Sequence, residues 1–301
     1  MKNNLAIVIP YYKIDFFKET LDSLKNQTNK NFNVYIGNDA SLNNPEELLA
    51  TYLDKLNITY HYFDKNLGSK SLVQQWNRCL ALVQNEKWLM ILGDDDVLAS
   101  NVVASFYENI EEIELEGSLV IRFASEVINE NSKKITTVFT HPEKENGLAF
   151  LERKLKGGTR SSLSEYIFNK KELLKIGIKD LPLAWYSDLL LVIELSVLNP
   201  IFSIDKSVVY FRNSGQNITS RKDNLVKKNE GTFGFYLYLI QNYQKQFSNS
   251  FLKVLYFNLE KTILDNKRQL QFWIKIFNLY VVNGRFLQFA SLLIKAIKRV
   301  L

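Results

Sequence analysis

Apolar and polar positions alternate in a regular order along the first third of the chain. Short, continuous apolar runs such as 5–10 (LAIVIP) and 88–92 (WLMIL) are typical of strands buried in a parallel sheet. Between them, apolar residues recur at helical spacing, as at Phe16, Leu21 and Leu24. The pattern predicts strands at 5–10, 32–36, 58–63 and 88–92, and helices at 14–27, 45–56, 70–82 and 97–112.

This alternation predicts the α/β class, with a doubly wound, mostly parallel sheet that has helices on both faces. The middle third is mixed, with strands expected at 119–123, 135–139, 166–168 and 207–211, a flexible polar loop at 157–162 and a helix at 185–198. From about residue 222, turn residues become rare, and a C-terminal helical appendage is predicted from the amphipathic stretches 222–246, 250–266, 269–281 and 284–300. We therefore expect two domains, 1–220 and 221–301.

Composition excludes several classes of protein. Apolar residues make up 46% and charged residues 23% of the 301 residues, which is ordinary globular usage. The single cysteine, Cys79, cannot close an internal disulfide, which fits a reducing compartment. No apolar run reaches the roughly 18–20 residues that span a bilayer, and the run after Met1 is too short for a secretory signal. A cytoplasmic location, in solution or peripheral on the cytoplasmic face of a membrane, is expected.

Charge is distributed unevenly. Residues 221–301 carry 14 Lys or Arg and 4 Asp or Glu, whereas the rest of the chain carries 24 basic and 28 acidic residues. A basic segment of this kind indicates an anionic partner, either nucleic acid or a membrane surface. No nucleic-acid recognition motif accompanies the charge, so nucleic acid is not expected as a partner.

The strongest chemical signal is a run of three acids, Asp94, Asp95 and Asp96, directly after a predicted buried strand. Buried carboxylates are unfavourable unless they are paired or bind a cation. Mg²⁺ and Mn²⁺ prefer carboxylate oxygens and often bind through one or two acids together with substrate phosphates. The alternative is a solvated acidic turn that caps the next helix.

Three further polar residues are candidates: Asp39 follows a predicted strand, and Lys70 and Arg78 lie on the helix predicted at 70–82. Asp39 ends the second strand, where its carboxylate could accept a hydrogen bond from a base imide N–H such as that of uracil; the alternative is an aspartate that stabilises its own turn. Lys70 and Arg78 could reach a diphosphate, or could simply form a solvated helix face. Competing chemistry lacks support: there is no glycine-rich dinucleotide or P-loop motif, and His61 and His141 give no zinc signature.

Several short motifs, in the right order, resemble the inverting family 2 glycosyltransferases of the GT-A fold over about residues 4–220. The start Ala6–Tyr12 (AIVIPYY) is similar to the family's VSVIIPxYN, and 21–28 (LDSLKNQT) is similar to SLxxQT. The segments 38–41 (NDAS) and 92–96 (LGDDD) resemble VDDxS and LDxDD. The remaining similarities are Asn66-Leu67-Gly68 with Asn77-Arg78, Ala184–Asp188 (AWYSD), and Tyr210–Gly215 (YFRNSG).

The resemblance implies a metal-dependent transfer of a sugar from a nucleoside-diphosphate donor, UDP-sugar favoured, to a hydroxyl of a glycan or lipid-linked glycan, in surface polysaccharide synthesis. Asp188 would be the catalytic base, and the alternative for it is a helix cap. Asp96 and Asp94 would hold Mn²⁺ or Mg²⁺. The implied donor-binding residues are Pro10, Tyr11, Tyr12, Asp39, Asn66, Gly68, Lys70, Arg78, Asp94, Asp95 and Arg212.

Two positions depart from the family pattern: Ser214 stands where the family has His, and Ser187 stands where it has Glu. A nucleotide-binding scaffold without catalysis is therefore an alternative function, and a sugar nucleotidyltransferase is a weaker one. The basic C-terminal helices either lie in a membrane interface or pack on the catalytic domain or a second copy of the chain.

Overall fold

The computed structural model describes residues 4–215, 220 and 222–298. Contacts divide the chain into two units. The first comprises Met1–Asp180 and Ser187–Arg221, and the second comprises Leu181–Tyr186 and Lys222–Leu301. The boundary between sheet and helices thus lies close to residue 221, and a short piece at 181–186 belongs with the helices.

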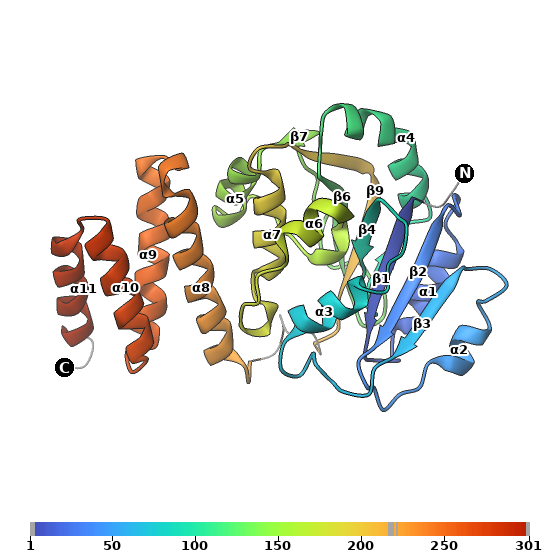
Figure 1. Ribbon diagram of the computed structural model, residues 1–301, viewed down its shortest axis with the longest axis horizontal. Coiled ribbons are helices and arrows are strands. Elements are labelled where there is room, and N and C mark those ends of the chain that lie inside the picture. The colour runs from blue at the N-terminus through green and yellow to red at the C-terminus, as the bar shows by residue number, and fades with distance from the viewer. Residues whose placement is uncertain (1–3, 216–219, 221, 299–301) are drawn as a thin grey trace. The chain divides into compact units, whose positions relative to one another are not determined.

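One half of the first unit's nine-stranded sheet is parallel (Figure 1). Its strands lie in the order β3-β2-β1-β4. Right-handed crossovers put α1 and α2 on one face and, because the direction of winding reverses after β3, α3 on the other. The elements are β1 (Leu5–Tyr11), α1 (Phe17–Lys25), β2 (Phe32–Asn38), α2 (Glu46–Ala50), β3 (Ile58–Tyr62), α3 (Leu72–Leu80) and β4 (Trp88–Ile91).

The other half of the sheet continues from β4 in the order β8-β6-β9-β5. β6 and β9 run parallel to each other, whereas β5, β7 and β8 pair antiparallel with their neighbours. Helices follow several of these strands. The elements are β5 (Val97–Leu98), α4 (Val102–Leu115), β6 (Val120–Asn129), β7 (Lys144–Glu145), α5 (Gly147–Leu155), η1 (Leu163–Glu165), β8 (Tyr166–Asn169), α6 (Lys170–Ile176), α7 (Ser187–Ser196) and β9 (Ile201–Asn213).

The core of this unit forms from the continuous apolar runs. Residues 5–9 of β1 and 88–92 around β4 are almost fully buried, because the central strands of a parallel sheet are covered on both faces. Helix α3 begins where the Ser71 hydroxyl accepts a hydrogen bond from the Gln74 N–H at 3.1 Å. This cap fixes the start of the helix that follows the Asn66–Gly68 turn. The α/β class with a mostly parallel sheet is confirmed.

The structure differs from the prediction in two places: the helix predicted at 97–112 begins only at Val102, and no regular strand forms at 135–139. Val97 and Leu98 form β5 rather than the start of a helix, because they pair with Val209 and Tyr210 of β9. Residues 135–139 form no regular strand: Phe139 makes an isolated bridge with Ser125, and Lys134, just before this range, makes another with Ile128. In both places, pairing with a distant strand decided the structure, and apolar content within a short window could not reveal it.

The second unit is helical, as predicted. It contains η2 (Pro182–Ala184), α8 (Leu225–Tyr243), η3 (Gln244–Gln246), α9 (Asn249–Asp265), α10 (Leu270–Val282) and α11 (Phe286–Lys298), and its four long helices lie side by side (Figure 1). The rings of Phe233 and Phe272 stack at 4.0 Å between α8 and α10. Gly231 lets α8 lie close to the 181–186 segment, since a Cβ at position 231 would lie 2.9 Å from the Cβ of Trp185. Over the described ranges, no helix combines the length and apolar character needed to cross a membrane.

Candidate active site

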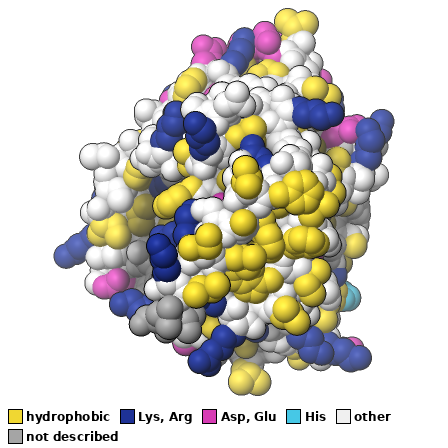
Figure 2. Space-filling view, turned by 90° about the vertical axis from the view of Figure 1, so that its left-hand side faces the viewer, with side chains coloured by type: hydrophobic (Ala, Val, Ile, Leu, Met, Phe, Trp, Pro, Cys, Tyr) yellow, Lys and Arg dark blue, Asp and Glu magenta, His cyan; other side chains and the backbone are white. Residues whose placement is uncertain are grey.

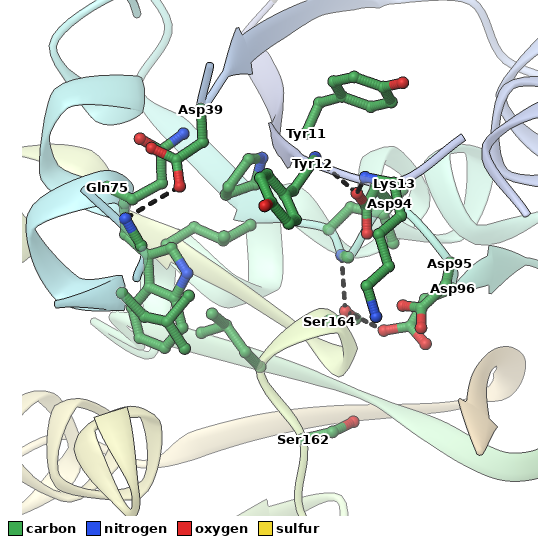
Figure 3. A pocket seen from close by; sticks show the side chains of 18 of the residues that line it. Tyr11, Tyr12, Lys13, Asp39, Gln75, Asp94, Asp95, Asp96, Ser162 and Ser164 are labelled. Atoms are coloured by element: carbon green, nitrogen blue, oxygen red, sulfur yellow. Dashed lines mark hydrogen bonds between the residues drawn. The ribbon is translucent and has the colours of Figure 1, made fainter. Parts of the chain in front are cut away.

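A cavity of about 530 Å³ opens at the carboxyl ends of β1, β2 and β4 (Figure 3). The register pairs Tyr11 with Asn38 and Val8 with Ile91, so the three strands end at one edge of the sheet. The winding direction reverses between β1 and β4, and open α/β sheets bind ligands at such a switch point. The lining residues proposed from the sequence are Pro10, Tyr11, Tyr12, Asp39, Asn66, Gly68, Asp94, Asp95 and Asp96.

The first acid of the triplet is held by the chain segment that follows β1. One oxygen of Asp94, Oδ2, accepts hydrogen bonds from the backbone N–H groups of Tyr12 at 2.7 Å and Lys13 at 2.8 Å. Burial raises the pKa of Asp94, and these two donors oppose the rise. The carboxylate therefore joins the loops after β1 and β4 into one wall of the cavity.

The third acid is held from the opposite side. Asp96 is 3% exposed, and its Oδ1 accepts the backbone N–H of Arg212 at 2.8 Å while its Oδ2 accepts the Ser164 hydroxyl. The Ser164 oxygen in turn accepts the backbone N–H of Gly93 at 3.0 Å (Figure 3). Burial raises the pKa of Asp96, and these donors lower it. Asp96 is thus fixed in orientation by η1 and β9.

Asp95 lies between these two carboxylates and is partly exposed. Burial and repulsion from Asp96 and Asp94 raise the pKa of Asp95 to about 8. Three neighbouring acids in this state would be stabilised by a cation, and their oxygens are the hard donors that Mg²⁺ and Mn²⁺ prefer. Among the residues described, no group of three or more His, Cys, Asp or Glu is arranged as a complete metal site. The donor set fits a cation whose remaining ligands come from substrate phosphate and water.

The carboxylate of Asp39 accepts hydrogen bonds from the turn that leads into α3. Its Oδ1 accepts the N–H of Leu67 at 2.7 Å and its Oδ2 accepts the N–H of Gly68 at 2.9 Å. A Cβ at position 68 would lie 2.5 Å from Oδ2, so the absence of a side chain permits this approach. Arg78 also pairs with Oδ1. Asp39 therefore faces the cavity from a rigid cradle.

Four of the proposed residues do not line the cavity. Arg78 donates to Asp39, Gln75 and the carbonyl oxygen of Lys65, with its guanidinium carbon 4.0 Å from the centroid of the Phe63 ring. Lys70 is exposed in the turn before α3. Asp188 stands in the first turn of α7 and Arg212 near the end of β9. Their proposed roles as diphosphate ligands and base stay predictions.

Arg212 is fully buried and its guanidinium is engaged by the protein itself. It donates to the carbonyl oxygens of Asp95 at 2.8 Å and Asn129 at 3.0 Å, to the Ser132 hydroxyl at 3.0 Å and to Glu19 Oε2 at 2.6 Å. Its backbone also holds Asp96. Through these contacts Arg212 positions the Asp94–Asp96 loop.

Asp188 carries a raised pKa, caused first by burial. The backbone N–H of Leu189 and the charges of Lys154 and Arg160 oppose that rise. Arg160 also lowers the pKa of Asp96, so one guanidinium acts on both acids. Its Nη1 is anchored by the Ser125 hydroxyl at 2.9 Å and Glu165 Oε2 at 3.0 Å.

Sequence reasoning missed Ser164 and Arg160. The sequence of 157–162 predicts only a flexible polar loop, and no motif marks Ser164. It reaches Asp96 because β8 pairs antiparallel with β4, a contact between residues that are about seventy positions apart. Trp76 and Leu163, which also line the cavity, carry no motif either. The only available signal was the serine-rich composition of 161–164.

The fold and the cavity define an α/β protein with a ligand site at the switch point of its sheet. The family model described as glycosyl transferase family 2 matches residues 6–175. Because this match covers more than half of the chain, the protein belongs to that family and is a glycosyltransferase. Among curated proteins, none matches the chain closely enough to count as a relative.

Solved structures share the fold. TarS 1–349 of S. aureus in complex with UDP-GlcNAc is 16% identical, with a TM-score of 0.62 over 92% of this chain and 76% of that chain. The same fragment in complex with UDP gives 0.58 at 16% identity over 87% and 71%. GalNAc-T7 with UDP, GalNAc and Mn²⁺ gives 0.53 at 10% identity over 87% and 56%. At these identities the likeness establishes the GT-A-like fold alone.

Proposed function

We propose that the protein transfers a sugar from a nucleoside-diphosphate donor, with UDP-sugar favoured, to a hydroxyl of a glycan or lipid-linked glycan. The observation that carries the proposal is the convergence of Asp39 and the Asp94–Asp96 loop on one cavity at the switch point. TarS, with UDP-GlcNAc bound, has the same fold, which supports the choice of donor class. A role in surface polysaccharide synthesis follows from the family resemblance and is part of the proposal.

The donor's base and its diphosphate would meet different parts of the cavity. Asp39, with its carboxylate aimed by Leu67, Gly68 and Arg78, is suited to accept a hydrogen bond from an imide N–H, which uracil has and cytosine lacks. Asp94 and Asp96, with Asp95 beside them, would hold Mn²⁺ or Mg²⁺. When bound, that cation supplies positive charge to the diphosphate as it leaves.

Asp188 is proposed as the general base. Burial raises the pKa of Asp188 above its ordinary value, which makes the carboxylate a stronger base, and the backbone N–H of Leu189 in the first turn of α7 binds it. The acceptor oxygen forms a bond to the anomeric carbon of the sugar while the bond from that carbon to the diphosphate oxygen breaks. The acceptor proton passes to Asp188, and the electron pair leaves with the nucleoside diphosphate. Attack from the face opposite the leaving group inverts the anomeric carbon.

We assign Arg160 an electrostatic role and not that of a diphosphate ligand, because it is engaged by protein groups, here Ser125 and Glu165, as Arg212 and Arg78 are. It acts electrostatically on Asp96 and Asp188 together. A guanidinium there favours the ionised form of both acids, which is the form that each proposed role requires.

The test is thermal stability against UDP, GDP, CDP and TDP, each with and without Mn²⁺. A ligand at about 100 times its dissociation constant adds about 2.7 kcal/mol to stability. We expect a metal-dependent rise in melting temperature with UDP that is lost in Asp96→Ala. If none of the four diphosphates shifts the transition, the proposed donor site is wrong.

A further inference from the structure

Helix α10 exposes an apolar stripe that its own unit does not cover. Leu270, Ile274, Phe277 and Val281 are spaced by four, three and four residues, so they lie on one side of the helix, and all four are exposed. The opposite side is already packed, since residues such as Ile276 are fully buried. Apart from Phe277, whose ring also contacts α11, the exposed stripe is therefore not the surface that holds the helices together.

Helix α11 continues the same surface. Phe286, Leu287, Ile294 and Ile297 are all more than half exposed, and Leu287 reaches 85%. Only Leu292 and Ala296 of this helix are buried. The two helices are neighbours, because the Phe277 ring of α10 lies 5.2 Å from the Phe289 ring of α11. We call the exposed apolar surface of the two helices the α10–α11 face; Figure 2 shows hydrophobic side chains gathered on it.

The charged residues within the segment that forms the α10–α11 face have one sign, although Lys295 of α11 pairs with Glu260 of α9 at 3.0 Å. No Asp or Glu occurs after Asp265, whereas residues 266–301 contain seven Lys or Arg. Lys275 on α10 and Lys298 on α11 are both exposed at the margin of the apolar stripes. Lys and Arg side chains border the hydrophobic patch in Figure 2 as well.

The excess of basic residues in 266–301 selects between possible occupants of this face. A second copy of the chain would bring two basic rims together, and like charges in apposition are unfavourable. An anionic lipid surface offers acyl chains to the apolar stripe and negative head groups to the lysines. Basic residues near such a surface contribute about 1 kcal/mol each.

We propose that the α10–α11 face lies on the surface of an anionic phospholipid bilayer, with both helices in the plane of the interface. Each helix has 13 residues and is about 20 Å long, which is shorter than the roughly 30 Å hydrocarbon core. An apolar side with cations at its margin is the pattern of helices that lie in the interface. The proposal is independent of the donor and of the transfer reaction.

The first test is co-sedimentation of the full chain with vesicles of phosphatidylcholine alone or of equimolar phosphatidylcholine and phosphatidylglycerol. We expect strong binding to the anionic vesicles only. The double variant Leu287→Glu/Ile294→Glu should lose at least about tenfold in partitioning, because two carboxylates enter the apolar surface. Leu115→Glu/Leu198→Glu adds the same charge at exposed apolar positions of the first unit and should bind as the original protein does.

A second variant tests the charge separately. Lys275→Gln/Lys298→Gln keeps the apolar stripe, so partitioning should fall about tenfold or more and should become less sensitive to salt. Circular dichroism and the UDP-dependent thermal shift verify that each variant is folded. Equal binding of all variants would overturn the proposal, as would binding to neutral vesicles at the same strength.

Sedimentation equilibrium distinguishes the remaining occupant. We expect the protein without vesicles to show the same mass whether or not it carries Leu287→Glu/Ile294→Glu. A concentration-dependent oligomer that this variant dissociates would identify a second copy as the occupant and overturn the lipid proposal. Loss of transfer activity with vesicle binding retained would count against the proposed function alone.

Discussion

The cavity of the first unit and the α10–α11 face of the second differ in opposite ways from an ordinary protein surface and core. In the cavity, polar groups are buried and held: Asp94 by two backbone N–H groups, Asp96 by Ser164 and Arg212. On the α10–α11 face, apolar side chains such as Leu287 are exposed to solvent over most of their surface. Each departs from the rule that polar residues lie outside and apolar residues inside, and such departures indicate function.

Because of this difference, mutations in the two regions should change different measured quantities: transfer activity for the cavity, and membrane binding for the α10–α11 face. Changing a held acid removes chemistry and also leaves its hydrogen-bond donors, such as the Ser164 hydroxyl, without their acceptor, so stability should fall as well. Changing an exposed apolar residue should alter neither stability nor transfer in solution. The predictions below run from the largest effect to the smallest.

Asp96→Ala should reduce transfer by about a thousandfold or more, because a charge-stabilising group close to the leaving diphosphate is worth several kcal/mol. Initial rates of donor consumption at saturating Mn²⁺ measure this loss. Asp54→Ala, which removes an exposed acid that lies outside the cavity and pairs with Lys55, is the control and should retain its rate. An Asp96→Ala protein with more than a tenth of the original rate would rule out the metal role.

Asp188→Asn should lower kcat by about a hundredfold to ten-thousandfold with little change in the dissociation constant of UDP, since general bases contribute about that much. In the original protein, activity should fall as pH drops through the pKa of Asp188, which burial raises above its ordinary 3.8. The base is active when ionised, so the acid limb should lie at a higher pH than an ordinary aspartate gives. A pH–rate profile of kcat measures it, and an unchanged acid limb in Asp188→Asn would contradict the assignment.

Gly68→Ala should weaken UDP binding and destabilise the first unit by about 1–3 kcal/mol, because the new Cβ would meet Asp39 Oδ2 at 2.5 Å. Calorimetric titration with UDP and urea denaturation report the two effects. Ser69→Ala changes the same turn without adding an atom near Asp39 and should be close to neutral. Equal effects of the two variants would mean that the Asp39 cradle does not set donor affinity.

Leu287→Glu should change the free energy of unfolding by no more than about 0.5 kcal/mol, since it lies at the exposed surface. Transfer to a water-soluble acceptor should also be unchanged. Leu292→Glu, five residues further along the same helix but fully buried, should destabilise the helical unit by several kcal/mol, about the cost of burying an unpaired charge. Similar losses from both would show that the α10–α11 face is packed rather than open.

Much of the parallel half of the fold could be predicted from the sequence, because each strand is a short apolar run and each following helix repeats its apolar residues locally. The acids Asp94–Asp96 could be expected at the edge of the sheet for the same reason. Pairing between distant strands could not be predicted: β5 forms only because Val97 and Leu98 meet β9, and Ser164 reaches Asp96 only through the pairing of β8 with β4. Nor does the type of a residue reveal whether its side chain is already bound by other groups of the protein. Arg212 was a candidate for binding phosphate by its chemistry, yet Glu19, Ser132 and two carbonyl oxygens engage its guanidinium.

The cradle around Asp39 has a consequence for how this site can evolve. Two of the three groups that hold the carboxylate are main-chain N–H groups, and every amino acid except proline carries one. Leu67 can therefore drift to almost any other residue without altering the hydrogen bond that it donates, whereas proline would delete it. Divergent sequences can keep one binding geometry in this way, with selection acting on Asp39 and Gly68 and only weakly on the side chain at position 67. A saturation library at position 67 would retain UDP binding throughout, with proline as the exception.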